Sequence, residues 1–274
     1  MFIAIAIEDF APSVVTAGRV LFGALAIGVL PAARPGIARA DWPRVGFLGV
    51  TWLAVPFACF SVAEQWIDSS LAGMLNGAMP LTTAAVAAAM LRRAPGVPQF
   101  AGLAVGFAGV VAVTLPALGT GSSSSVTGVA LVLVAITCYG LAANVSVPLQ
   151  QRYGPVPVLL RAQLVALALT APFGVAGLRR STFDADALAA VAVLGALGTG
   201  LAFVALGALL ARVGAARGAV AVYLVPVVAV AAGVAVRGED VAPLSLLGTA
   251  LVAAGAVLTS RAERRPTSTP APRA

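Results

Sequence analysis

The segment MPLTTAAVAAAMLRRAPGVPQFAGLAVGFAGVVAVT, residues 79–114, is echoed by VPVVAVAAGVAVRGEDVAPLSLLGTALVAAGAVLTS, residues 225–260. Without gaps, a shift of 146 residues aligns three Pro and Gly positions: Pro80 with Pro226, Gly102 with Gly248 and Gly109 with Gly255. Apolar matches alone mean little in a chain this rich in Ala and Val. Three coincident Pro and Gly positions at one shift are harder to obtain by chance, so the sequence predicts an internal repeat.

The composition outside these segments is equally apolar. Hydrophobic residues make up 60% of the 274 residues and charged residues 10%, and the mean hydropathy is +1.01. A soluble domain carries roughly 25% charged residues, so the chain is expected in a lipid bilayer. All 17 basic residues are Arg and lie mostly in short gaps between apolar runs. That placement is typical of membrane proteins and argues against nucleic acid as a partner, despite the net charge of +7.

Several kinds of site are excluded by residue content. The chain has no His, which removes His-based catalysis and His metal ligands. Cys59 and Cys138 lie inside apolar runs and are interpreted as small buried side chains rather than a disulfide or a zinc site. No ATP-binding motif is present. We therefore expect neither a metal nor a cofactor.

An apolar helix needs about 20 residues to cross a bilayer. Nine runs meet this length, at residues 12–31, 45–66, 70–91, 100–118, 128–148, 156–177, 187–211, 218–236 and 243–260. The fold class predicted is an all-α polytopic membrane protein. Residues 119–127 form a Ser-rich linker near mid-chain, and the polar, Pro-rich residues 261–274 are expected to be a disordered cytoplasmic tail.

The first residues do not form a complete span. Met1–Ile7 is apolar, but Glu8 and Asp9 follow at once. This stub is typical of the last two turns of a helix, and we expect coding sequence upstream of Met1 to supply the rest. The predicted organisation is therefore five plus five helices with the first helix truncated, as a first repeat over residues 1–118 and a second over residues 128–260.

Charge predicts the orientation. One set of alternate loops, with the C-terminal tail, holds 12 of the 17 Arg residues, and the other set holds three Arg but seven of the ten acidic residues. The positive-inside rule places the Arg-rich loops and the C-terminus in the cytoplasm, here of a bacterial plasma (inner) membrane. An odd number of helices in each repeat makes the two repeats inverted. Inverted repeats are typical of secondary transporters, whose substrate site lies near the membrane midplane.

Motifs in both halves resemble those of one family. The second half contains a GAAR turn (residues 214–217), a helix with L-x-P (224–226), the pair Gly238–Glu239 and a Gly-rich last helix. The first half contains AGRVLFGALAI (17–27) and LNGAMPL (75–81). In this order the motifs resemble the EamA-type transporters of the drug/metabolite transporter superfamily over nearly the whole chain. The resemblance implies five plus five helices that move small metabolites, often outward.

The chain departs from that family in two places. Its first helix is mostly absent. The pair Gly238–Glu239 falls, at the shift of 146, on Arg92–Arg93. A role of Glu239 in the second half therefore cannot be assumed for the first half.

Two charged residues within or near spans are candidate site residues. Arg19 lies seven residues into its span, roughly 10 Å deep at 1.5 Å per residue, where a charge costs roughly 3 kcal/mol. It is interpreted either as a ligand of a substrate carboxylate or as half of a structural pair. Glu64 is interpreted either as a proton-coupling carboxylate or as an interfacial residue beside Trp66.

A second set of candidates surrounds the two aligned prolines. Asn76 lies four residues before Pro80, which removes the hydrogen bond to the carbonyl of residue 76. Tyr223 and Pro226 form a similar pair in the second repeat. Both helices are predicted to kink, either to line a cavity with polar groups or only to improve packing.

Other features inside the spans have two interpretations each. Tyr139 and Asn144 are candidate substrate-binding residues, although interhelical hydrogen bonds would explain them equally well. The glycines at 102, 106, 109, 248 and 255 form a small-residue face that could join two copies in a homodimer or two helices of one chain.

The function expected is secondary transport of a small metabolite, with export of amino acids or related compounds as the preferred activity and with alternating access between the two repeats. The partners expected are this metabolite and the lipid bilayer. A non-transporting scaffold or sensor is the alternative. A lipid-active enzyme is a further alternative, but no Lys or His exists and the acids are scattered over loops.

Overall fold

The computed structural model describes residues 1–90, 96–119, 123–218, 221–222 and 224–262. This part of the chain consists of helices and their connections and contains no strand. The α-helices are α1 (Phe2–Ala6), α2 (Pro12–Gly28), α3 (Trp42–Leu48), α4 (Val55–Ala63), α5 (Ser69–Asn76), α6 (Met79–Met90), α7 (Val97–Gly119), α8 (Ser123–Tyr153), α9 (Pro155–Gly177), α10 (Ala185–Val193), α11 (Ala202–Val213), α12 (Ala215–Gly218), α13 (Leu224–Arg237) and α14 (Pro243–Ala262). Two π-helical segments, η3 (Gly49–Ala54) and η5 (Leu194–Leu201), join α3 to α4 and α10 to α11.

Apolar helices dominate the described residues. Five helical stretches are long and apolar enough to cross a membrane: Arg39–Ala63, Ser69–Met90, Ser125–Tyr153, Pro155–Arg180 and Ala185–Val213. Four apolar helices are shorter: Pro12–Gly28, Phe100–Pro116, Val225–Val236 and Pro243–Thr259. Large side chains such as Phe107 and Phe173 are exposed on the outside of the bundle. An apolar exterior of this kind suits a polytopic membrane protein, and the number of spans stays a prediction.

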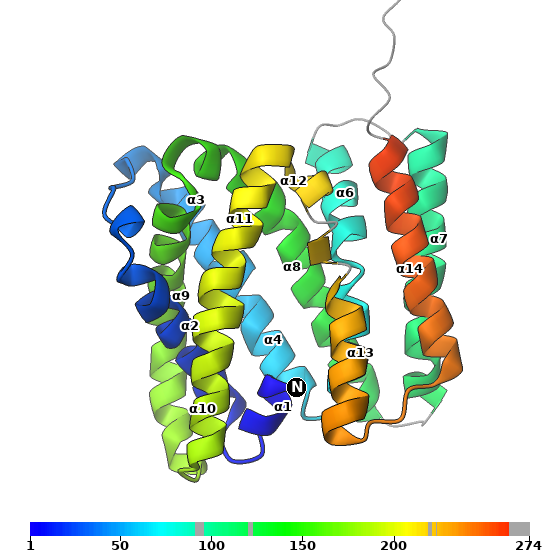
Figure 1. The fold of residues 1–274 in the computed structure, drawn as a ribbon, viewed down its shortest axis with the longest axis horizontal. Coiled ribbons are helices and arrows are strands. Elements are labelled where there is room, and N and C mark those ends of the chain that lie inside the picture. The colour runs from blue at the N-terminus through cyan, green and yellow to red at the C-terminus, as the bar shows by residue number, and fades with distance from the viewer. Residues whose placement is uncertain (91–95, 120–122, 219–220, 223, 263–274) are drawn as a thin grey trace, which may run out of the picture.

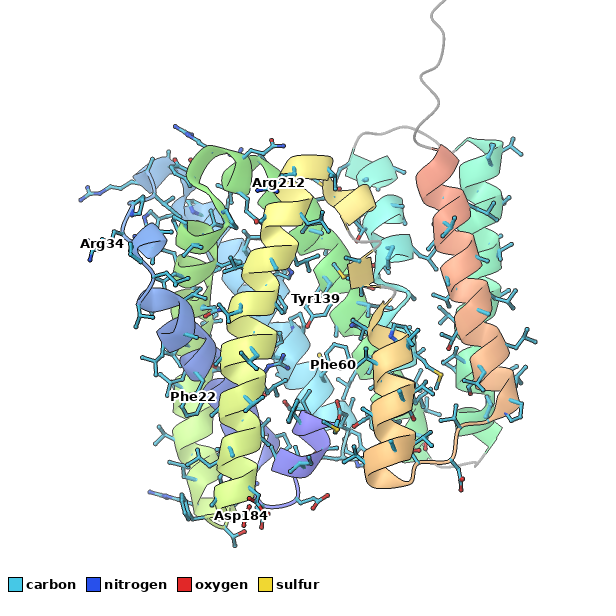
Figure 2. All side chains as sticks on the ribbon, viewed as in Figure 1. Phe22, Arg34, Phe60, Tyr139, Asp184 and Arg212 are labelled. Carbon is cyan, nitrogen blue, oxygen red and sulfur yellow. The ribbon has the colours of Figure 1, made fainter. Side chains whose placement is uncertain are left out.

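Figure 1 shows how the helices are arranged. The helices α2, α9, α10 and α11 form one side of the bundle, α7, α13 and α14 form the other, and α4 and α8 run between them. Arg34 and Arg212 lie at one end and Asp184 at the opposite end (Figure 2). These three charged residues are thus separated along the helix axes.

Several element boundaries differ from those expected, and three of them affect the predicted linker, the span 70–91 and the tail. The helix α8 begins at Ser123, inside the predicted linker 119–127; residues 120–122 lie outside the described residues. The predicted span 70–91 is broken at Gly77 and Ala78 into α5 and α6. Pro80 therefore sits in the first turn of α6, where a missing N–H costs no helical hydrogen bond. The helix α14 continues to Ala262, and the rest of the predicted tail lies outside the described residues.

The shift of 146 residues extends beyond the aligned sequence segments. It carries α2 onto α9, α6 onto α13 and α7 onto α14, and it carries η3 into η5. Since π-helices account for well under 1% of residues, their coincidence is independent support for a repeat. Each of α2 and α9 packs on the π-helical segment of the other half: α2 packs on η5, and α9 packs on η3.

The glycine face joins two helices of the same chain. The helices α7 and α14 lie side by side (Figure 1). A Cβ added at Gly109 would lie 2.7 Å from the Gly248 carbonyl oxygen, and one added at Gly102 would lie 2.7 Å from the Gly255 carbonyl oxygen. Only glycine permits backbones to approach this closely. In the structure, the glycine face therefore packs two helices of one chain together.

Candidate functional site: a central cavity between the two halves

A cavity of about 350 Å³ lies between the two halves of the chain. Four candidate residues line it: Arg19, Glu64, Asn76 and Tyr139. They come from α2, the end of α4, α5 and α8, while η5, α11 and α13 supply the opposite wall. The sequence therefore located most of the polar residues of this cavity.

The cavity is built from equivalent positions of the two halves. Four pairs of lining residues are 146 positions apart: Trp52 and Gly198, Phe60 and Leu206, Asn76 and Val222, and Met79 and Val225. The shift also places Arg19 on Val165 and Glu64 on Leu210. The first half thus carries the charged side chains, and the second half has aliphatic residues at the same positions.

Arg19 is buried, with 6% of its surface exposed. Its Nε donates a hydrogen bond to Thr199 Oγ1 at 3.1 Å, and its guanidinium carbon lies 3.6 Å from the centroid of the Phe57 ring. Among the described residues neither Nη group has an acceptor, and no acid forms an ion pair with Arg19. A buried guanidinium with both Nη groups available can bind a carboxylate bidentately.

The segment η5 holds Arg19 in place. Thr199 Oγ1 accepts from Arg19 and donates to the Leu194 carbonyl at 3.3 Å, while Gln163 Nε2 donates to the Thr199 carbonyl at 3.0 Å. A Cβ added at Gly195 would lie 2.7 Å from the Arg19 carbonyl oxygen. This glycine therefore lets α2 approach η5 closely enough for the Arg19–Thr199 bond.

Aromatic rings form a continuous wall beside Arg19. Phe203 contacts Trp52 at 5.7 Å, Phe57 at 5.6 Å and Tyr139 at 6.4 Å between ring centroids, and Phe60 stacks on Tyr139 at 6.2 Å. Phe60 and Tyr139 are visible between α11 and α13 in Figure 2. Phe203 and Phe60 were not predicted as site residues. The signal for Phe203 was the shift of 146, which aligns it with Phe57.

Glu64 follows the last residue of α4 and lines the same cavity. Its Oε2 accepts a hydrogen bond from Ser69 Oγ at 2.7 Å. The backbone N–H groups of Ser69 and Ser70 donate to the Glu239 carboxylate at 3.2 and 2.9 Å. The Gly-Glu pair of the second half thus contacts the first half directly. This contact could not be predicted from the sequence, because Glu239 and Ser69 are 170 residues apart.

The two candidate asparagines have different environments. Asn76 faces the cavity, and its Oδ1 is buried without a hydrogen-bond partner in the described part of the chain. Asn144 is not among the lining residues; its Nδ2 donates to the carbonyls of Thr83 and Gly140, both at 2.9 Å. Asn144 therefore joins α6 to α8, which was the alternative interpretation. Tyr223 lies outside the described residues, and Pro226 is buried against Gly77.

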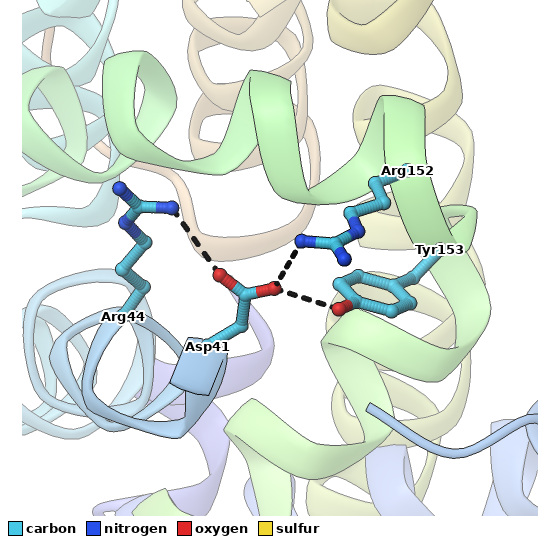
Figure 3. Close-up of polar contacts among 4 residues, drawn as sticks. All are labelled: Asp41, Arg44, Arg152 and Tyr153. Carbon is cyan, nitrogen blue, oxygen red and sulfur yellow. Dashed lines mark hydrogen bonds and ion pairs between the residues drawn. The ribbon is translucent and has the colours of Figure 1, made fainter. Parts of the chain in front are cut away.

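A polar cluster that the sequence did not indicate lies away from the cavity. The Asp41 carboxylate accepts from Arg44 at 3.2 Å, from Arg152 at 2.9 Å and from the Tyr153 hydroxyl at 2.6 Å (Figure 3). Asp41 precedes α3, whereas Arg152 and Tyr153 end α8. The cluster ties the first half of the chain to the first helix of the second half.

The comparisons with known proteins agree with this architecture. A family model described as "EamA-like transporter family" matches residues 1–115 and 126–261. The chain belongs to this family. It is therefore a transporter-family membrane protein, as the motifs in both halves predicted.

Two relatives and one solved structure resemble this EamA-like chain. The "Probable terminal-alkyne amino-acid exporter" of Streptantibioticus cattleyicolor is 29% identical over 251 residues, which cover 90% of the chain and 83% of the relative. An "Uncharacterized transporter" of Archaeoglobus fulgidus is 24% identical over 221 residues, covering 81% and 78%. A crystal structure with a TM-score of 0.68 and 19% identity covers 94% of this chain and 96% of its own, and it supports the fold alone.

Proposed function

We propose that the chain is a secondary transporter of a small zwitterionic metabolite of the amino-acid type, which it exports across the inner membrane of a bacterium. The observation that carries this proposal is the buried Arg19 guanidinium in the cavity, whose Nη groups have no acceptor among the described residues. A buried cation left in that state is costly. A substrate carboxylate would supply the missing charge and both hydrogen-bond acceptors.

The other lining residues fit the rest of such a substrate. Glu64 places a carboxylate in the cavity that holds Arg19, and opposite charges suit the two ends of a zwitterion. The unpartnered Oδ1 of Asn76 is a further acceptor for an ammonium group. The aromatic wall of Trp52 and Phe203 suits an apolar substrate side chain. A volume of about 350 Å³ is at the lower end of ligand pockets, which suits a small molecule.

The repeat suggests how the substrate moves. Rocking one half against the other would open the cavity to each side of the membrane in turn. Glu64 is the proposed proton-coupling group, since it can hold either a proton or the substrate's ammonium group. The name of the Streptantibioticus cattleyicolor relative supports both an amino-acid cargo and the outward direction.

Counterflow in liposomes tests this function. The purified protein is reconstituted with unlabelled L-amino acids inside, and uptake of labelled L-amino acids, including a terminal-alkyne amino acid, is measured. We expect counterflow by the unmodified protein. Arg19→Gln should raise the substrate KM about 10- to 100-fold, since a hydrogen bond to a charged group contributes about 1.5–3 kcal/mol.

Arg161→Gln is the matched control. Arg161 is also an Arg inside a span, but it does not line the cavity, and its Nη1 donates to the carbonyls of Ala33 and Pro157. Its replacement should leave KM unchanged. Binding of amino acids without counterflow would favour the scaffold or sensor alternative. Unchanged KM in a stable Arg19→Gln protein would remove Arg19 from the binding site.

A further inference from the structure

We propose that Ser69 and Glu239 are positioning residues for Glu64, and that together they form a hydrogen-bonded chain through which the second half of the molecule holds the cavity carboxylate. The proposal rests on the proposed function, because it assigns a role to residues around the substrate site. It concerns the Gly-Glu pair, which occurs only in the second half of this sequence.

The N-terminal cap of α5 is unusual. The first N–H groups of a helix have no partner within the helix and are usually satisfied by the N-cap side chain. Here Asp68 occupies the N-cap position, but its side chain makes no capping hydrogen bond. Glu239, which belongs to the other half of the chain, caps the helix instead. Its Oε1 accepts from Ser69 N–H and its Oε2 accepts from Ser70 N–H. The carboxylate also lies favourably at the positive end of the helix dipole.

Ser69 contacts both carboxylates. Its backbone N–H donates to Glu239, and its hydroxyl donates to Glu64 Oε2 at 2.7 Å. Ser69 is 5% exposed, so the packing around it limits the rotamers of its hydroxyl. The donor on Oε2 orients the Glu64 carboxylate, which lines the cavity. The position of the Glu64 carboxylate thus depends on where Glu239 holds the start of α5.

The local backbone structure places the Glu239 side chain. Gly238 has φ +64°, in the left-handed region that glycine adopts without strain. The N–H groups of Gly238 and Glu239 donate to the carbonyls of Val234 and Gly233 at 3.1 and 3.2 Å and close the end of α13. A Cβ at Gly233 would overlap the Glu239 carboxylate. Two glycines therefore direct this one side chain toward α5.

Chemical labelling of Glu64 tests the proposal without a substrate. Dicyclohexylcarbodiimide reacts with protonated carboxyl groups in membrane proteins, and mass spectrometry of the full-length protein's peptides gives the rate at Glu64. Ser69→Ala removes the hydroxyl that stabilises the ionised carboxylate, so labelling should become about tenfold faster. Glu239→Gln keeps the size of the side chain but weakens the cap, and it should change the rate in the same direction.

Ser70→Ala is the matched control. Ser70 is also buried and also donates its backbone N–H to Glu239, but it has no hydrogen bond to Glu64. Its replacement should leave the labelling rate unchanged. Unchanged labelling in Ser69→Ala, or an equal increase in Ser70→Ala, would overturn the proposal. Glu64→Gln confirms that the labelled site is Glu64.

A double-mutant comparison connects the labelling to transport. The substrate KM is measured for Ser69→Ala, Glu64→Gln and the double variant, with the labelled amino acid that gives the largest counterflow. If Ser69 acts through Glu64, Ser69→Ala alone should raise KM several-fold. In a protein that already carries Glu64→Gln, adding Ser69→Ala should leave KM unchanged. Additive effects would contradict the positioning role. Absent counterflow with altered labelling would contradict the proposed function alone.

Discussion

The rings of Phe57 and Phe203 meet edge to face beside the cavity, with centroids 5.6 Å apart, although the two residues are separated by 146 positions. Equivalent residues of two related halves can touch only near the axis that relates the halves. The glycines of α7 and α14 show the matching reciprocal pattern, because Gly102 faces Gly255 and Gly109 faces Gly248. The shift of 146 positions relates the pair Gly102–Gly255 to the pair Gly248–Gly109. This relation supports the predicted inverted repeat.

Two glycines of η5 should respond differently to the same substitution. A Cβ at Gly195 would lie 2.6 Å from Phe22 Cβ and 2.7 Å from the Arg19 carbonyl oxygen, whereas one at Gly198 meets only Leu194 Cδ1 at 3.5 Å. Gly195→Ala should therefore push α2 away and cost about 1–3 kcal/mol of stability. Gly198→Ala should keep the thermal midpoint within about 2 °C. Melting of both purified variants in detergent checks this, and equal midpoints would contradict the close packing of α2 on η5.

Much of the fold could be predicted because it is determined by local composition. Apolar length identified the helices, and the aligned Pro and Gly residues gave the shift of 146 that the π-helical segments also follow. A charge in an apolar run is a strong signal as well, since burying one requires a partner or a cavity. Arg19 and Glu64 were found for that reason.

The contacts that could not be predicted join residues far apart in the sequence. Asp41 meets Arg152 across 111 positions, and Glu239 meets Ser69 across 170. The residues around Asp41 and Glu239 in the sequence do not indicate which distant residue each acid contacts. Asn76 and Asn144 illustrate the same limit, because both are amides in apolar runs and only packing decides which one faces the cavity. The start of α8 at Ser123 was missed because a Ser-rich composition is typical of linkers.

The orientation can be tested with cysteines at the two ends of the bundle. Phe183 is 81% exposed beside Asp184, and Gly36 lies in the Arg-rich loop with no atom near its Cβ position. In a background with Cys59→Ala and Cys138→Ala, Phe183→Cys should react with an impermeant maleimide added to intact cells. Gly36→Cys should react only after the cells are opened. The reverse pattern would overturn the predicted topology.

The cluster around Asp41 should contribute to stability rather than to binding. Asp41→Asn leaves the Tyr153 hydroxyl and two guanidinium groups with a weaker acceptor, and we expect a loss of about 1–2 kcal/mol. Arg44 is 63% exposed, so Arg44→Gln should cost less than about 1 kcal/mol. The thermal midpoint should decrease more in Asp41→Asn than in Arg44→Gln, and KM should be unchanged in both variants. A larger effect of Arg44→Gln than of Asp41→Asn would show that the buried carboxylate is not the centre of the cluster.

The two asparagines give the sharpest separation of binding from folding. Asn76 Oδ1 has no partner in the described part of the chain, so Asn76→Leu removes an unsatisfied polar atom, and stability should be unchanged or higher. Asn144→Leu removes hydrogen bonds to the Thr83 and Gly140 carbonyls and should cost about 1–3 kcal/mol. In counterflow the order should reverse, with KM raised at least fivefold in Asn76→Leu and unchanged in Asn144→Leu. Loss of stability without a change in KM in Asn76→Leu would assign that residue to helix packing at the break between α5 and α6 instead of to the substrate.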